Sequence, residues 1–383
     1  MRKIYFDNNA TTPLDPVVRG AMLPYLDDLY GNPSSGHRFG EAARAGIEEA
    51  RQQVAELLQT TPNRLIFTSG GSEANNLAIW SAVFANLQRK HIITSVVEHD
   101  SVLAPLAFLR ERLGYEITIL PVNQQGDLDL AELSEAIRPD TLLVSLMGAN
   151  NETGVLWPVE KIGAICRERA VFFHCDAVQL VGKYALDLAT LPVDYLTISA
   201  HKLHGPKGVG LLYARRSVPV SPMIMGSGQE NGFRSGTENA AGIVGFGKAC
   251  QLAGGAIEAH SEQLQVLRNR LEAGIIAEIP EVQINGGKMA RLANTINVSF
   301  KHASGAAMIQ ELDERGIAVS AHAACHSGDL NPSHVLLAMG VAEPYLHGTL
   351  RISLSRFNTM AEVEEVLAVL PGIVAKSRQG FAL

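Results

Sequence analysis

Short apolar runs alternate with longer mixed segments through the first two thirds of the chain. The runs that predict buried strands are 65–68, 91–95, 117–120, 141–147, 171–174, 195–198 and 210–213. The intervening segments, interpreted as helices, are 40–58, 72–87, 101–113, 130–137 and 159–169. Alternation of this kind predicts a mostly parallel sheet with helices on both faces.

The pattern changes after about residue 255. The elements expected there are helices at 262–277, 304–314 and 360–370 and strands at 295–300, 317–319 and 349–354. The last helix opens with a capping box, Thr359-x-x-Glu362. These elements predict a smaller α+β domain. We therefore expect a large domain over 15–255 and a small domain formed by 1–14 and 256–383.

Composition narrows the function classes. The 383 residues are 46% hydrophobic, which supports a sizeable core, and the net charge of −7 argues against nucleic-acid binding. The four cysteines form no Cys-x-x-Cys pair, which argues against a zinc or thioredoxin-type site, and their scarcity suggests a reducing compartment. We find no signal-peptide pattern and no long uncharged apolar run, so we expect a cytoplasmic protein without membrane contact.

The stretch Ser199-Ala-His-Lys202-Leu-His-Gly-Pro-Lys-Gly208 follows the apolar run 195–198. The carboxyl ends of strands are where open α/β sheets bind ligands. A lone lysine is usually a solvated surface charge. Here the lysine lies between apolar sequence and backbone-exposing glycines. That context favours a desolvated amine that forms a Schiff base with a carbonyl cofactor.

A glycine-containing turn, Ser69-Gly-Gly-Ser72, joins the run 65–68 to the next predicted helix. Backbone N–H groups at such a helix start can bind phosphate, although an ordinary turn with a good cap gives the same pattern. The turn lacks Gly-x-Gly-x-x-Gly, so a dinucleotide site is weakly supported.

Polar residues also follow other predicted strands. His99 follows the run 91–95 and could equally be a buried, neutral core histidine. Asp176 leaves an apolar strand, where a carboxylate is costly unless it is paired; its partner is the protonated ring nitrogen of a cofactor, or the aspartate is a simple cap. Arg351 lies in the apolar strand 349–354 and needs a carboxylate partner, from a substrate or from the protein itself.

Cys325 lies among small residues, with His322 and His326 near it in sequence and Gly328 after it. An ordinary thiol is mostly protonated at neutral pH, and neighbouring histidines can help to form the thiolate. The alternative is an incidental exposed cysteine. Cys166 and Cys175 fall in apolar segments and are interpreted as small buried hydrophobes.

Together these motifs resemble those of the NifS/IscS cysteine desulfurases, within the class V aminotransferase-like enzymes. Ser-x-His-Lys-x-x-Gly-Pro-x-Gly at 199–208 is similar to the family's pyridoxal-phosphate lysine motif. The resemblance runs from Tyr5-Phe-Asp-Asn-Asn-Ala-Thr-Thr12 to Leu350-Arg-Ile-Ser-Leu-Ser-Arg356. Three positions depart from the family's common pattern: Ser72, often threonine there, Asn231, often arginine, and His326, often threonine.

The resemblance implies a fold-type I enzyme that uses pyridoxal 5'-phosphate and forms a homodimer. The residues it implies for cofactor binding are Gly71, Ser72, His99, Asn151, Asp176, Gln179, Ser199, His201, Lys202 and Thr237. Lys202 binds the cofactor, His99 stacks on its ring and Asp176 holds its ring nitrogen. Asn151 and Arg351 bind substrate. Thr237 donates to the phosphate of the partner subunit's cofactor.

The implied reaction removes sulfur from L-cysteine, leaving L-alanine and a persulfide on Cys325. Lys202 or His99 takes the Cα proton. The sulfur passes to an acceptor such as an iron–sulfur scaffold; no resident metal is expected, although Cys325 can contact a nascent cluster. Three alternatives remain: a selenocysteine lyase, an aminotransferase without need of Cys325, and a non-catalytic cofactor-binding protein.

Overall fold

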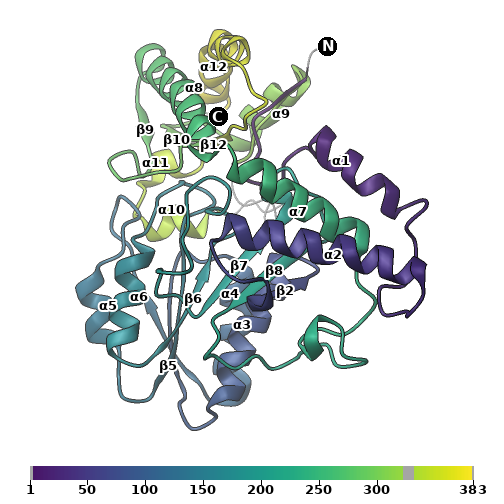
Figure 1. Cartoon of the computed structure of the whole chain (residues 1–383). Coiled ribbons are helices and arrows are strands. Elements are labelled where there is room, and N and C mark those ends of the chain that lie inside the picture. The colour runs from purple at the N-terminus through teal and green to yellow at the C-terminus, as the bar shows by residue number, and fades with distance from the viewer. Residues whose placement is uncertain (1–2, 322–331, 382–383) are drawn as a thin grey trace.

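The computed structural model describes residues 3–321 and 332–381. Its main element is a seven-stranded sheet in the order β2-β8-β7-β6-β5-β3-β4 (Figure 1). The strands, in that order, are Leu65–Thr68, Gly210–Ala214, Tyr195–Ser199, Phe172–Asp176, Thr141–Met147, His91–Ser95 and Glu116–Leu120. Only β8 runs antiparallel to its neighbours. Six of the strands are buried along nearly their whole length, which explains their continuous apolar sequence.

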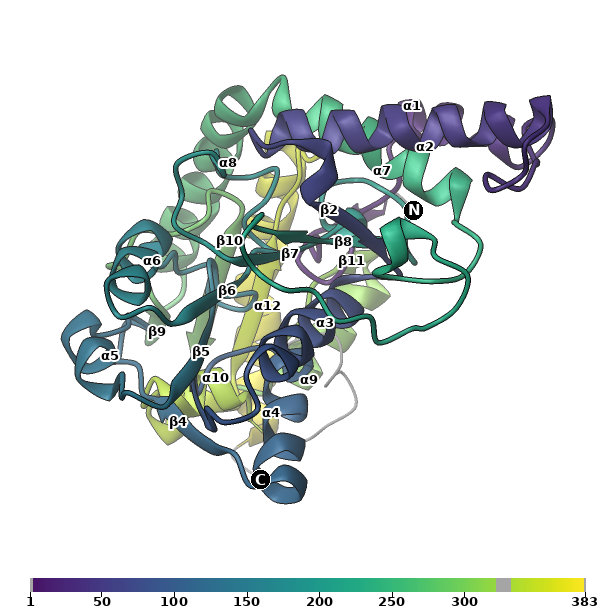
Figure 2. The ribbon, with the colours of Figure 1, turned by 60° about the horizontal axis from the view of Figure 1, so that its bottom comes forward.

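Helices cover both faces of this sheet, which confirms the predicted fold class. The helices are α2 (Arg38–Leu57), α3 (Gly71–Ala85), α4 (Asp100–Leu113), α5 (Leu130–Ala136), α6 (Val159–Glu168) and α7 (Ala240–Gly254). One core contains side chains of α2, α6 and α7, such as Ile47, Ile162 and Phe246. A second core on the other face contains Ala78 of α3 and Leu106 of α4. Figure 2 shows α2 and α7 on one side of the sheet and α3 and α4 on the other.

A smaller antiparallel sheet has the order β12-β10-β9, formed by Thr349–Ser353, Thr295–Phe300 and Val282–Ile284. Helices α8 (Ile257–Glu278), α9 (Gly305–Glu314) and α12 (Met360–Phe381) share its core. The remaining helices are α1 (Pro16–Met22), α10 (His334–Ala338) and α11 (Glu343–Leu346). The N-terminal arm joins this core, because β1 (Ile4–Tyr5) pairs in parallel with β11 (Ile317–Ala318) and Phe6 is fully buried there. The proposed division into domains at residues 14 and 255 stays a prediction.

The last helix is longer than expected. The predicted end at 370 is wrong, because α12 continues through Pro371 to Phe381. Ile373 and Val374 are buried in the same core as the first turns of the helix, so packing outweighs the local effect of the proline.

Among the residues described, no single helix is long and apolar enough to cross a membrane. The pair α7 and α8 reaches the required length and apolar content only jointly, across a bend of 74°.

A buried ion pair fixes the loop between β8 and α7. Arg51 of α2 donates two hydrogen bonds to Glu230, at 2.9 and 2.7 Å, and a third to the carbonyl of Leu65 at 3.0 Å. Glu230 also accepts from the backbone N–H of Phe67 at 2.8 Å. The pair therefore ties the loop to both α2 and strand β2.

We expect Glu230→Gln to lower the free energy of unfolding by about 3 kcal/mol, because it removes the buried counterion of Arg51 and leaves only the exposed Glu48 at 3.5 Å. Urea denaturation followed by circular dichroism measures this. The matched control is Glu364→Gln, which breaks an equally short but exposed pair with Arg270 and should cost less than about 1 kcal/mol. Equal losses in the two variants would contradict the interpretation.

Candidate active site

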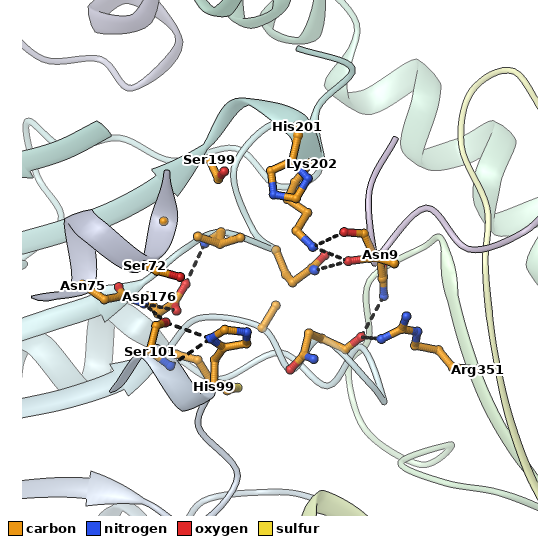
Figure 3. Close-up of a pocket in the computed structure, with 17 residues that line it drawn as sticks. Asn9, Ser72, Asn75, His99, Ser101, Asp176, Ser199, His201, Lys202 and Arg351 are labelled. Carbon is orange, nitrogen blue, oxygen red and sulfur yellow. Dashed lines mark hydrogen bonds between the residues drawn. The ribbon is translucent and has the colours of Figure 1, made fainter. Parts of the chain in front are cut away.

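A cavity of about 240 Å³ lies at the carboxyl ends of the central strands. The predicted site residues that line it are Gly71, Ser72, His99, Asn151, Asp176, Gln179, Ser199, His201, Lys202 and Arg351 (Figure 3). They come from the large sheet, the helices that follow its strands, and strand β12 of the smaller sheet. The N-terminal arm closes one side with Asn9 and Ala10.

Lys202 ends a 3₁₀ turn, Ala200–Lys202, that directly follows strand β7. Its Nζ donates to the carbonyl of Asn9 at 2.5 Å and to that of Ala10 at 2.8 Å. Gln179 donates to the same Asn9 carbonyl at 2.9 Å. The arm thus orients the lysine amine and the amide of Gln179 together.

Lys183 is a second amine that sequence reasoning missed. Its Nζ donates to Gln179 Oε1 at 2.7 Å and to Asn9 Oδ1 at 3.3 Å. Burial, followed by the charges of Lys202 and Arg351, lowers the pKa of Lys183 to about 7. Lys183 follows Gln179 by four residues, and this spacing could have indicated the contact. The spacing is informative only if the segment is already known to form a turn.

Asp176 lies at the end of strand β6 and is 8% exposed. Its Oδ1 accepts from the backbone N–H of Val178 at 3.0 Å, and its Oδ2 accepts from Asn75 at 2.8 Å. Asn75 also donates to Ser101, which contacts His99. Asn75 and Ser101 were not predicted, because they meet Asp176 only through the fold.

Part of the cavity wall is suited to an anion. Gly71 and Ser72 form the start of helix α3, where backbone N–H groups and the helix dipole favour negative charge. The Ser199 and His201 side chains line the same cavity. Burial, followed by the charges of Lys202, Lys207 and Lys183, lowers the pKa of His201 to about 4. A Cβ on Gly71 would lie 2.9 Å from Val178, so this approach requires glycine.

Arg351 is almost fully buried, with 1% of its surface exposed. Its Nη2 donates to Asp7 at 2.7 Å and its Nη1 to the Asn151 carbonyl at 3.4 Å. The Nε is buried and has no hydrogen-bond partner in the described part of the chain. The guanidinium therefore has an ion pair within the protein, and the Arg351 side chain also lines the cavity, where its charge favours a ligand carboxylate.

One predicted residue lines another pocket, and another falls outside the described residues. Thr237 lines a separate pocket with Gly208 and Arg234, not the cavity that contains Lys202. Cys325 lies outside the described residues, as do His322 and His326. The chain on either side is anchored near the cavity: Ser320 pairs with the backbone of Arg351, and Ser333 donates to Glu152 at 2.6 Å.

Three cysteines, Cys166, Cys175 and Cys250, are buried, which confirms the interpretation of the first two. Burial raises the pKa of Cys166 to about 12 and raises those of Cys175 and Cys250 well above the ordinary thiol value. None of the three is a thiolate at neutral pH. In the described residues, no group of three or more His, Cys, Asp or Glu side chains could hold a metal ion.

The donor set fits pyridoxal 5'-phosphate. The helix start with Ser72 suits its phosphate, Asp176 its ring nitrogen, and Lys202 its aldehyde carbon. Arg351 lines the same cavity and brings a positive charge that suits a carboxylate.

Known proteins are similar to this chain in both sequence and fold. The model of the family "Aminotransferase class-V" matches residues 4–366. The curated "Cysteine desulfurase 2" of Trichormus variabilis is 48% identical over 381 residues, covering 99% of this chain and 94% of that protein. A solved "NIFS-LIKE PROTEIN" superposes with a TM-score of 0.92 at 38% identity, covering 98% of this chain and 100% of that one. The structure "SspA in complex with cysteine" has a TM-score of 0.81 at 36% identity, covering 94% and 100%.

Glu98, next to His99 in the sequence, makes the stability of the folded protein depend on pH. Its carboxyl is fully buried and accepts from Ser95 and from the Met147 backbone, each at 2.9 Å. Burial raises its pKa from 4.5 to about 8. Between pH 4.5 and about 8, the folded state therefore keeps a proton that the unfolded state has lost. The contribution of Glu98 to stability falls as the pH rises through this range.

We expect Glu98→Gln, which resembles the protonated carboxyl, to gain stability relative to the wild type as pH rises from 4.5 to about 8. Urea denaturation at several pH values measures the difference, with Glu132→Gln on the exposed surface of α5 as the control. A difference between Glu98→Gln and wild type that does not change with pH would show that Glu98 is ionised in the folded protein.

Proposed function

The chain belongs to the class V aminotransferase family and is a cysteine desulfurase, and we propose that it transfers the sulfur of L-cysteine to Cys325. The observation that carries the site assignment is the meeting of Lys202, Asp176 and Arg351 in one cavity. A lysine amine, a carboxylate and a buried guanidinium are the three groups that this chemistry requires.

Pyridoxal 5'-phosphate is the proposed cofactor, and when bound it supplies an electron sink for the electron pair left at the substrate Cα. Gly71, Ser72, Ser199 and His201 would hold its phosphate, Asp176 its ring nitrogen and Gln179 its ring hydroxyl. Lys202 would bind it covalently. The carbonyls of Asn9 and Ala10 hold the lysine amine in place as a hydrogen-bond donor.

Arg351 binds the substrate carboxylate. Its side chain lines the cavity, and its pair with Asp7 fixes the plane of the guanidinium. The substrate is thereby oriented with its Cα toward Lys202. Asn151, whose carbonyl already contacts Arg351, lies at the same end of the cavity.

Cys325 accepts the sulfur. Its thiolate attacks the sulfur of the substrate, a new S–S bond forms and the Cβ–S bond breaks. The electron pair of that bond stays with the substrate carbon, which gains a proton and leaves as part of L-alanine. The high pKa values of the three buried cysteines support this assignment, because they remove those thiols as nucleophiles.

We also propose a homodimer that passes the persulfide sulfur to an acceptor such as an iron–sulfur scaffold. Thr237, which lines a pocket separate from the Lys202 cavity, would then serve the cofactor of the partner. Exposed apolar side chains at Leu26, Tyr30 and Met225 are consistent with a covered face. The cytoplasmic location stays a prediction from the sequence.

Cys325→Ala is expected to bind the cofactor with an unchanged absorption band but to release almost no alanine from L-cysteine. The matched control, Cys166→Ala, removes a buried thiol and should keep wild-type turnover. If Cys325→Ala keeps its turnover, the thiol is not the acceptor, and direct elimination or transamination becomes the better account. Parallel assays with L-selenocysteine distinguish a selenocysteine lyase.

Arg351→Lys keeps the charge but loses the planar fork that binds a carboxylate. We expect the KM for L-cysteine to rise about tenfold to hundredfold, since hydrogen bonds to charged groups contribute roughly 1.5–3 kcal/mol. Steady-state alanine release measures this. An unchanged KM would mean that Arg351 serves only its structural pair with Asp7.

A further inference from the structure

A chain of hydrogen bonds connects Asp176 to His99 across two helices. Asn75 Nδ2 lies 2.8 Å from Asp176 Oδ2 and 2.8 Å from Ser101 Oγ. Ser101 Oγ lies 2.8 Å from His99 Nδ1. Figure 3 shows these side chains side by side at one end of the cavity. Asn75 comes from α3, whereas His99 and Ser101 lie at the start of α4.

The direction of each hydrogen bond follows from the carboxylate. An ionised carboxylate only accepts, so the Asn75 group that faces Asp176 is the amide NH₂. Its two hydrogens point to Asp176 and to Ser101. Ser101 Oγ therefore accepts from Asn75 and must direct its own hydrogen elsewhere.

That hydrogen goes to His99. The Ser101 hydroxyl donates to Nδ1, and the backbone N–H of Ser101 donates to the same atom at 3.1 Å. Two donors on Nδ1 require a lone pair there, so the proton of the neutral ring is on Nε2. His99 lines the cavity, and no hydrogen bond of its Nε2 is found with any residue in the described ranges.

We propose that Asn75 and Ser101 are positioning residues that fix the tautomer of His99, so that the ring presents an N–H donor to the substrate cavity. This inference rests on the proposed function, because it takes the cavity to be the substrate site. Asp176 then has two tasks: it binds the cofactor ring nitrogen, and it sets the direction of the hydrogen bonds that end at His99.

The fixed tautomer decides between two roles for His99. A ring with a proton on its cavity-facing nitrogen can stabilise an acceptor, such as the sulfur or the developing negative charge of the substrate. It cannot take the Cα proton at that nitrogen. Removal of the Cα proton is therefore assigned to Lys202, which resolves the choice that the sequence left open.

The test measures the tautomer directly. Holoenzyme labelled with ¹⁵N-histidine is examined by long-range ¹H–¹⁵N NMR at pH values where the His99 shifts no longer change, with His99→Gln used to assign the signals. We expect a pyridine-type shift for Nδ1 and a pyrrole-type shift for Nε2. Pyrrole-type Nδ1, or a ring protonated on both nitrogens throughout, would overturn the proposal.

Two variants test the part played by Ser101. Ser101→Ala removes one of the two donors to Nδ1 and should move both nitrogen shifts toward intermediate, averaged values. Ser101→Thr keeps the hydroxyl and should restore the wild-type shifts. If Ser101→Ala has the same shifts as wild type, the hydroxyl does not set the tautomer and Ser101 is not a positioning residue.

Turnover gives a second readout. In Ser101→Ala we expect kcat for alanine release to fall about threefold to tenfold, a fraction of the roughly 10²–10⁴ that proton-transfer groups contribute. The KM for L-cysteine should change little, since Arg351 is untouched. If the holoenzyme releases no alanine at all, the proposed function fails, but the nitrogen shifts still decide whether the tautomer is fixed.

Discussion

The site depends on one constraint: the buried polar groups of Asn9 must all have hydrogen-bond partners. Asn9 is 1% exposed and lies where the two sheets meet. Its backbone and side-chain groups bond to Asn151, Gln179, Lys183, Lys202, Asn294, Thr295 and Ser353. Each such group left without a partner would cost about 1–3 kcal/mol. The arm, the large sheet and the small sheet must therefore assemble together, and the lysine amine is positioned as part of that assembly.

The cavity concentrates basic groups in a chain of net charge −7. Lys202 and Arg351 face it, and the lowered pKa values of Lys183 and His201 show the cost of burying further positive charge. The lowered pKa values of Lys183 and His201 favour their neutral forms, and a bound anion would favour their protonated forms. A phosphate near His201 and a carboxylate near Arg351 are the anions that the proposed reaction brings.

Most of the fold could be predicted because its strands are buried on both faces. Such strands are apolar throughout, as in 141–147, and the polar residue that ends each one is conspicuous. Asp176, His99 and Lys202 were found in this way. Asn9, Asn75, Ser101 and Lys183 were not, because their importance comes from partners far away in the chain, such as residues 75 and 176. The end of the last helix was predicted wrongly, because α12 continues past Pro371, where packing outweighs the local effect of the proline.

The anchors on either side of Cys325 set a limit on where sulfur can be delivered. Ser320 is fixed to the backbone of Arg351, and Cys325 follows it by five residues. A fully extended chain advances about 3.5 Å per residue, so the Cys325 Cα can lie no farther than roughly 17 Å from Ser320. This tether defines a sphere around Ser320, whose backbone is paired with that of Arg351. An acceptor protein must bring its own nucleophile inside that sphere, so its docking distance is set by the length of the chain as much as by the chemistry of the thiol.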